Sequence, residues 1–512
     1  MNTSLLFNAR VLTMDSGRPH AQAVAIRDGR IAAAGTEAEA ARALDAGAER
    51  VDCQGGLLLP AFIDAHCHLL AYAASLRSVD CSAARSIAEI QAAIRDRAAA
   101  TPAGQWIRAA GYEETQLQEQ RHPDRRDLDA AAPGHPLRLI HRSGHASVLN
   151  SAALRLAGID TATEEPPGGV IDRDLEDGEP SGRLIGMEQV IDRAAPAMPY
   201  EELAGAVREA AERFLAAGVT CIQDATHTNG LSEWRLFERL IADGALPLDV
   251  VLMEGYEHLG ELPESAAGGR LRRGPVKIML HELGESIEPN EAELARRVAR
   301  VHEAGRQVAV HAVGERAVAA AASAIEAAVR SQPRPDHRHR IEHCGLLPDG
   351  LATKLAQLGI VVVSQPSFIA ERGDRYLQLV PEEQQGALYA FRTLRDAGVA
   401  LAAGSDAPVT PPDSLRSIAA AVDRLSASGA AVAPGQAVDV EDALGWWTAG
   451  AARAAFLEEE RGAIRPGLPA DLVLLSGSGA NRSPGGVGTL SIARIWRAGE
   501  AVEQAATGSG SA

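Results

Sequence analysis

The sequence predicts an α/β fold: a (β/α)8 TIM barrel with a second module at the chain ends and a large insertion after the first barrel strand. Apolar, β-branched runs alternate with stretches of helical period that are rich in Ala, Glu and Arg, and repeated β–α units indicate a parallel sheet. The 512 residues exceed the ~250 residues of a plain barrel. The runs expected to form the eight barrel strands are 60–68, 218–224, 246–253, 274–280, 307–311, 337–343, 359–365 and 399–406.

The barrel itself is expected to span residues 60–459. Eight parallel strands close on themselves, and in such barrels the chemistry lies at the C-terminal ends of the strands. The connection between the first two strands, 69–215, is several times longer than a normal barrel connection. We therefore expect 69–215 to form an inserted subdomain over the barrel mouth.

Both chain ends carry short strand-like runs that the barrel does not need. Residues 1–59 contain several such runs, broken by turn signals such as Asp28-Gly29, and 460–505 contains two more. Since a barrel rarely requires strands before its first strand or after its last helix, the two ends are expected to build one composite module.

Two histidines, His66 and His68, close the first barrel strand. Side chains alternate between the faces of a strand, so the two imidazoles point the same way while Cys67 points the other. Two imidazoles one pleat apart can share a cation, and imidazole with carboxylate suits Zn²⁺ or a similar divalent metal. The alternative is a chance pair at a polar strand end.

Lys277 lies on the fourth strand in a chain that otherwise uses arginine. Of the 50 Lys and Arg residues, only Lys277 and Lys354 are lysine. A desolvated lysine can lose its proton, whereas arginine stays charged, and a neutral amine reacts with CO₂ to give a carbamate that can bridge two metals. The alternative is an ordinary lysine whose ammonium reaches the barrel mouth or pairs with Glu282.

His311, His343 and Asp406 fall at the ends of the fifth, sixth and eighth strands. A lone strand histidine is more often a core group, but two on successive strand ends fit a second metal better. Asp406, followed by Pro408, is either a turn or cap residue or a metal-bound base. Its place at the end of the eighth strand favours the base.

Three further charged residues are weaker candidates. Glu342 precedes His343 and is expected to point to the opposite face, toward the helical layer. Arg372 and Arg375 follow the seventh strand and are expected either to hold a carboxylate or to form a solvated charged face.

These segments together resemble the amidohydrolase superfamily, and the surrounding residues resemble its family-3 branch, which includes N-substituted formamide deformylase-like and related N-acyl hydrolases. The resemblance spans most of the chain, and its segments are specific as a set. They are Pro60 to His68, Gly274-Pro275-Val276-Lys277-Ile278, His311-Ala312-Val313-Gly314-Glu315-Arg316-Ala317, Arg340-Ile341-Glu342-His343, Gly404-Ser405-Asp406-Ala407-Pro408-Val409 and Gly467-Leu468-Pro469-Ala470-Asp471-Leu472-Val473.

The resemblance carries further expectations. It implies that 1–59 and 460–505 form a small β-sandwich, and that Lys277 is carboxylated where two metals are bound, although other branches hold one metal. The branch also carries a Gly-His-Ala segment similar to that around His145, followed by Asn-Ser and Ala-Leu. His145 is therefore a candidate substrate contact; the alternative is that it precedes and caps the helix starting near Asn150.

The expected function is metal-dependent hydrolysis of a C–N bond in a small amide, formamide or cyclic amide. One or two divalent ions, Zn²⁺ or similar, would activate a hydroxide. Asp406 would act as general base and then as general acid toward the leaving nitrogen. The ligand set is equally compatible with a deaminase or an esterase of the superfamily. A catalytically inactive assembly protein is the third reading.

Composition restricts the partners. A formal charge of −18 argues against nucleic acid and anionic membranes, because phosphate binding needs a basic surface. The chain shows neither a signal-like segment at its start nor an apolar run long enough for a membrane span, and its five cysteines lack CxxC spacing. We expect a cytoplasmic enzyme with a small-molecule substrate, and the sequence allows a homo-oligomer.

Overall fold

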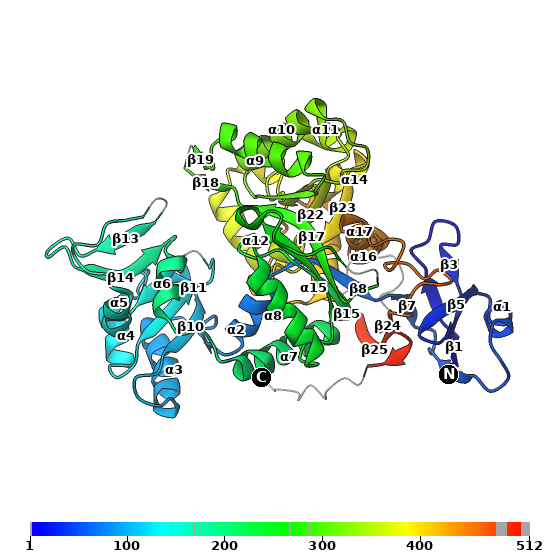
Figure 1. Ribbon diagram of the computed structural model, residues 1–512, viewed down its shortest axis with the longest axis horizontal. Helices are drawn as coiled ribbons and strands as arrows, with labels where there is room; N and C mark the ends of the chain where they lie inside the picture. The colour runs from blue at the N-terminus through cyan, green and yellow to red at the C-terminus, as the bar shows by residue number, and fades with distance from the viewer. Residues whose placement is uncertain are drawn as a thin grey trace. The chain divides into compact units, whose positions relative to one another are not determined.

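The computed structural model describes residues 3–144, 146–166, 169–265, 268–284, 286–477 and 489–502. The chain divides into two compact units (Figure 1). One comprises Met1–His68 and Ala211–Ala512, and the other comprises Leu69–Ala210.

The first unit contains the predicted barrel, which the structure confirms. Eight parallel strands pair in sequence order, and each is rich in buried Val, Ile, Ala or Leu, as a strand covered on both faces requires. The strands are β8 (Phe62–Cys67), β15 (Val219–Asp224), β16 (Asp249–Gly255), β17 (Leu271–Ile278), β20 (Val308–Ala312), β21 (Arg340–His343), β22 (Val361–Ser364) and β23 (Ala400–Ala403).

Helices follow the barrel strands along the chain. They are α8 (Leu231–Ala242), α9 (Glu291–Glu303), α10 (Glu315–Ser331), α11 (Leu351–Gln357), α12 (Ser367–Leu379), α13 (Glu382–Gln385), α14 (Phe391–Asp396), α15 (Ser414–Asp423), α16 (Val440–Trp446) and α17 (Ala449–Ala454). A short hairpin, β18 (His281–Leu283) with β19 (Ser286–Glu288), follows β17. Among the described residues, every helix falls short of the length and hydropathy that crossing a bilayer requires.

The last barrel strand returns to the first through backbone hydrogen bonds just beyond the strand ends. The amide of Asp406 donates to the carbonyl of His66 at 2.7 Å, and the amide of His68 donates to the carbonyl of Ala407 at 2.8 Å. Gly404 makes this approach possible, because a Cβ there would lie 2.5 Å from the backbone nitrogen of His66. These contacts form the seam of the barrel.

Two sheets at the chain ends form the expected second module. Strands from both termini pair directly, since β7 runs antiparallel to β24 (Figure 1). One sheet has the order β5-β4-β1-β6 and the other β26-β25-β24-β7-β2-β3, and they share a core that includes Leu6, Val24, Leu58, Leu472 and Trp496. The bounds are β1 (Thr3–Phe7), β2 (Arg10–Leu12), β3 (His20–Ala21), β4 (Ala23–Arg27), β5 (Arg30–Gly35), α1 (Glu37–Arg42), β6 (Glu49–Asp52), β7 (Leu57–Pro60), β24 (Leu472–Ser476), β25 (Ser491–Arg497) and β26 (Glu500–Ala501).

The second unit has its own sheet, with the order β13-β14-β12-β11-β10-β9. Its core packs α3 and α4 against this sheet through Ile90, Ile94, Leu128 and Leu139. The bounds are α2 (Leu69–Ser75), β9 (Val79–Asp80), α3 (Ile87–Ala100), β10 (Ile107–Tyr112), α4 (Arg125–Ala131), β11 (Leu137–His141), β12 (Ala146–Leu149), α5 (Ser151–Ala157), β13 (Val170–Arg173), β14 (Pro180–Ile185) and α6 (Glu188–Ala194), with α7 (Tyr200–Ala216) leading back to β15.

Three buried histidines, His302, His337 and His339, lie near the start of β21. This start is at the opposite end of the strand from its carboxyl end. The Nδ1 of His339 accepts the amide of Val308 at 3.0 Å, so its Nε2 carries the proton and donates to His302 Nδ1 at 2.8 Å. His337 Nδ1 likewise accepts the amide of His339 at 2.9 Å. Burial, aided by the charges of His337, Arg334 and His302, lowers the pKa of His339 to about 2. The network therefore requires a neutral His339.

This network predicts an acid-sensitive fold. An unfolded histidine binds a proton near pH 6.5, whereas folded His339 does not until about pH 2, so its contribution to stability is lost progressively as pH falls below ~6.5. We expect His339 alone to reduce the free energy of unfolding by about 2 kcal/mol between pH 7 and pH 5. His339→Asn keeps an oxygen for the Val308 amide and should flatten this pH dependence.

Chemical unfolding at the two pH values, with the exposed His20→Asn as control, measures the difference. Equal pH dependence in wild type and His339→Asn would show that the network does not titrate with folding.

Candidate metal centre

The structure brings the six predicted side chains together at the carboxyl ends of the barrel strands. His66 lies in β8 and His68 directly after it, Lys277 in β17, His311 in β20, His343 at the end of β21, and Asp406 just beyond β23.

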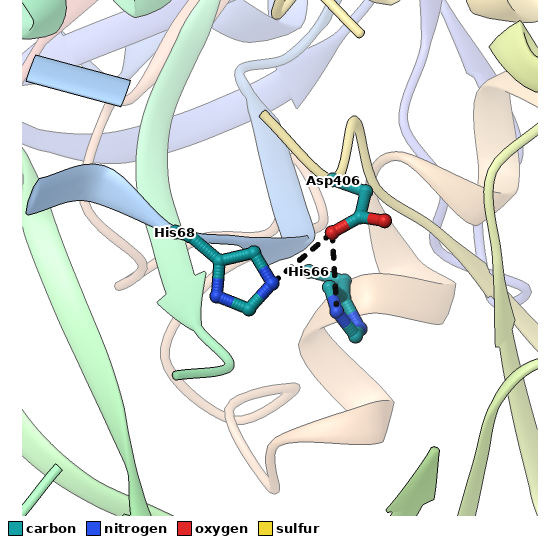
Figure 2. A group of neighbouring side chains, drawn as sticks. All are labelled: His66, His68 and Asp406. Atoms are coloured by element: carbon teal, nitrogen blue, oxygen red, sulfur yellow. Dashed lines mark ion pairs between the residues drawn. The ribbon is translucent and has the colours of Figure 1, made fainter. Parts of the chain in front are cut away.

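The side chains of His66, His68 and Asp406 form the tightest group. The Oδ1 atom of Asp406 lies 3.1 Å from His68 Nε2 and 3.5 Å from His66 Nε2 (Figure 2). One ligand atom from each of the three residues lies within 4.8 Å of the others. The side chain of His66 is 1% exposed and that of His68 is 25% exposed, so only His68 reaches solvent appreciably.

Lys277, His311 and His343 complete the cluster. The Lys277 Nζ lies 3.4 Å from His66 Nε2, and His343 Nε2 lies 2.9 Å from His311 Nδ1. The imidazoles of His66 and His343 are neighbours, with ring centroids 4.8 Å apart. Glu282, considered as an alternative partner of Lys277, accepts the amide of Ala317 at 2.9 Å at the start of α10.

His343 and Asp406 have left-handed backbone conformations, with φ of 70° and 57°. The alternation of side chains between the two faces of a strand therefore stops before these residues. The side chain of each points in a direction that a regular strand would not give it. The expectation that Glu342 faces the helical layer is wrong for this reason. Its carboxylate accepts a hydrogen bond from His66 Nδ1 inside the barrel.

A layer of polar groups fixes the orientation of the imidazoles. Arg340 holds Glu342 in place, with its Nε 2.7 Å from Oε1 of the carboxylate. The Glu342 carboxylate accepts a hydrogen bond from Nδ1 of His66, so Nε2 of that ring carries a lone pair and no proton. Gln365 Oε1 lies 2.7 Å from His343 Nδ1 and has the same effect on that ring. This is the support that metal-ligating histidines usually have.

Sequence reasoning missed these supporting residues. The available signal was the Arg340 and Glu342 pair, two charged residues two apart in a strand that must be buried, which predicts an ion pair facing the barrel interior. Gln365 lies just past the end of β22 and carried no comparable signal.

The protonation states suit a cation. Burial is the largest cause that lowers the pKa of His66, His311 and His343, and the charge of Lys277 adds to it, so these rings are neutral. Burial alone would raise the pKa of Asp406, but the hydrogen bond that His68 donates opposes burial, and the pKa of Asp406 is held below its usual range. Neutral imidazole and ionised carboxylate are the forms that bind a divalent metal.

Two of the candidate metal-binding atoms are hydrogen-bond acceptors that face each other, and a positive charge beside them would be stabilising. His66 Nε2 has only a lone pair to present, yet it lies 3.5 Å from an oxygen of the Asp406 carboxylate. Two acceptors at this distance repel unless a cation lies beside them. The residues therefore fit a divalent metal.

Burial lowers the pKa of Lys277 to about 8, against the opposing charges of Glu342 and Asp406. About a tenth of this amine is neutral at pH 7, far more than for an ordinary lysine, and the neutral form is the one that reacts with CO₂. The substrate-contact candidate His145 lies outside the described residues.

Comparisons with known proteins agree with this geometry. The model of the amidohydrolase family matches residues 49–502. The N-substituted formamide deformylase of Arthrobacter pascens is 31% identical, with 97% of each chain covered. Two crystal structures of uncharacterized metal-dependent hydrolases, from Pyrococcus furiosus and Pyrococcus horikoshii, are similar to this chain, each with 25% sequence identity. The TM-scores are 0.72 and 0.74, respectively. The matches cover 92% and 94% of this chain and 98% of each of those chains.

Proposed function

Because this chain belongs to the amidohydrolase family, we propose that it hydrolyses the C–N bond of a small amide, formamide or cyclic amide. One or two divalent ions would be held by a set of six residues: His66, His68, Lys277, His311, His343 and Asp406. Family membership makes the protein a hydrolase of carbon–nitrogen bonds other than peptide bonds. The finer assignment of metal and substrate is our proposal.

One observation carries the proposal: neutral imidazoles and an ionised carboxylate converge on one point at the barrel mouth. The Oδ1 atom of Asp406 faces the Nε2 atoms of both His66 and His68. His68 donates a hydrogen bond to this carboxylate, as in a structural pair, but His66 presents a lone pair to it. An assembly protein has no need of such an arrangement.

The residues divide the chemistry among them. A divalent ion bound here supplies a Lewis acid and a water of lowered pKa. Asp406 stays ionised at neutral pH, so it can accept a proton from the attacking water and return it to the leaving nitrogen. Glu342 and Gln365 hold the imidazoles of His66 and His343 with Nε2 directed into the site.

Formamides are the first substrates to test, because a relative of this chain is an N-substituted formamide deformylase. The experiment is a screen of N-formyl, N-acyl and cyclic amides, with the protein loaded with Zn²⁺ and its metal content measured. Release of formate or another carboxylic acid together with an amine supports the proposal. Ammonia release from an amino-substituted ring would indicate a deaminase, and ester cleavage alone an esterase.

We further propose that Lys277 reacts with CO₂ to form a carbamate, an anion that would serve as a ligand shared by the metals where two ions are bound. The Nζ attacks the carbon of CO₂ and releases a proton, and the product is an anion where an ammonium stood. The lowered pKa of Lys277 and its position 3.4 Å from His66 Nε2 support this proposal.

Lys277→Arg should therefore lose metal. The guanidinium stays protonated and cannot form a carbamate, so metal affinity should fall by about tenfold or more although the positive charge and length are kept. Metal content after dialysis and hydrolysis rate are the two measurements. The control is Lys354→Arg, because Lys354 is a partly exposed residue paired with Glu326 on the outer helices.

A short carboxylic acid added to Lys277→Ala should restore part of the metal content by replacing the missing anion. Full occupancy by two ions in Lys277→Arg would contradict the carbamate and leave the hydrolase assignment intact.

A further inference from the structure

Arg372 lies on α12, the helix that follows β22 at the carboxyl end of the barrel. Phe368 and Arg372 are one helical turn apart and share a face. The guanidinium carbon of Arg372 lies 5.0 Å from the centroid of the Phe368 ring. That ring stacks on the imidazole of His343, with centroids 6.4 Å apart and planes 11° apart. Arg372 is therefore one aromatic ring away from the proposed metal ligands.

Two nitrogen atoms of this guanidinium are buried without an acceptor. Nε and Nη2 of Arg372 have no hydrogen-bond partner within the part of the chain that the structure describes. A buried donor left unpaired costs free energy, and a buried cation without an anion costs more. Arg340, which is also buried, shows the usual solution, because Glu342, Gln223 and the carbonyl of Ala65 satisfy it.

The two unpaired atoms form one edge of the guanidinium. Nε–H and Nη2–H point in the same direction, and this edge matches the two oxygens of a carboxylate, which accept one hydrogen bond each. A single cation in aromatic surroundings is balanced by a single negative charge, which favours a carboxylate over a phosphate dianion. The unsatisfied edge thus has the donor geometry that a carboxylate requires.

The surroundings connect this edge with the proposed metal centre. Tyr376 and Tyr389 share a hydrogen bond between their hydroxyl groups at 3.0 Å, and the Tyr389 ring lies edge-on to Phe368 at 6.2 Å. Burial raises the pKa of both tyrosines. The positive charge of Arg372 lowers the pKa of each tyrosine, and the negative charge of Asp406 raises it. The tyrosine pair therefore lies within electrostatic reach of both Arg372 and Asp406.

We propose that Arg372 binds a carboxylate of the substrate, so that the preferred substrates are anionic amides such as N-formyl or N-acyl amino acids. The substrate carboxylate would pair with Nε and Nη2 of Arg372, and the amide carbonyl would lie at the cluster of His66, His68 and Asp406. Phe368 would contact the part of the substrate between these two groups. This inference rests on the proposed amide hydrolysis and adds the substrate class.

The test compares matched substrates. N-formyl ω-amino acids of increasing chain length are assayed beside N-alkylformamides of the same length, which have the same scissile bond without the charge. The wild type should show a higher kcat/KM for the anionic member at its preferred length. Arg372→Gln should lower kcat/KM for that member by about 10- to 100-fold, mainly through KM, and leave the neutral member nearly unchanged.

Two further variants separate charge from geometry and from position. Arg372→Lys keeps the charge but loses the paired donors, so it should recover only part of the preference. Arg375→Gln removes an arginine three residues further along α12 and should retain the wild-type preference. Equal losses in Arg372→Gln and Arg375→Gln would overturn the inference, because they would indicate a general field rather than a site.

Binding of hexanoate to protein stripped of metal gives a readout independent of hydrolysis. Titration calorimetry should detect binding of hexanoate, but not hexanamide, to the wild type, and no binding to Arg372→Gln. If hexanoate binds only when metal is present and Arg372→Gln binds it equally well, the carboxylate sits on the metal and the inference fails. If hexanoate binds through Arg372 but no amide is hydrolysed, the proposed function fails and the carboxylate site stands.

Discussion

Replacing His66 with alanine is expected to remove the metal and, with it, hydrolysis. His66 Nε2 is the atom that lies near both Lys277 Nζ and Asp406 Oδ1, so its loss disconnects the cluster. Activity should fall by more than about 100-fold, beyond the ~10- to 100-fold typical of a residue that only supports a ligand. Metal stoichiometry and kcat/KM, measured on the same preparation, check this result.

His66 is fully buried, so its truncation leaves a cavity that could unfold the barrel. His68→Ala provides a second variant, because the His68 side chain is 25% exposed and lies at the barrel mouth. Glu342→Gln should give the smaller loss of a supporting residue, and His20→Ala, on the exposed strand β3, should change nothing. Full metal content and full activity in both His66→Ala and His68→Ala would refute the ligand assignment.

Asp406→Asn should slow the chemical step while sparing much of the structure. The amide cannot accept and return a proton, so we expect kcat to fall by about 10²- to 10⁴-fold. The amide oxygen remains a neutral ligand, and metal content should fall less than in His66→Ala. Single-turnover rates beside metal content separate these two effects.

Asp413→Asn is the matched control for this substitution. Asp413 accepts the amide of Arg416 as the N-cap of α15, a role in which asparagine serves as well as aspartate. A kcat near the wild-type value in Asp406→Asn, with full metal content, would exclude Asp406 as the base.

The barrel and the six clustered side chains were predictable because each depends on local sequence. Strand runs with buried Val and Ile show the β–α order, and a residue at a strand end reaches the barrel mouth whatever the details of packing. Residues His66 and His68 illustrate this, since strand alternation alone places both imidazoles on one face.

The supporting contacts could not be predicted because they depend on backbone conformation and on partners distant in sequence. Alternation from His343 placed Glu342 on the wrong face, because the left-handed conformation at His343 breaks the strand period. The pairing of Glu342 with His66 joins residues 276 positions apart. Likewise, nothing in the sequence distinguishes Arg372, with two unpaired buried nitrogens, from its neighbour Arg375.

The seam of the barrel has a consequence for the order of events during synthesis. Asp406 donates its backbone amide to His66 and also supplies the carboxylate that faces it, so closure of the barrel and completion of the donor set depend on the same residue. The second module closes later still, when β24 pairs with β7. A segment of the chain that ends before Asp406 therefore holds neither the closed barrel nor the full donor set.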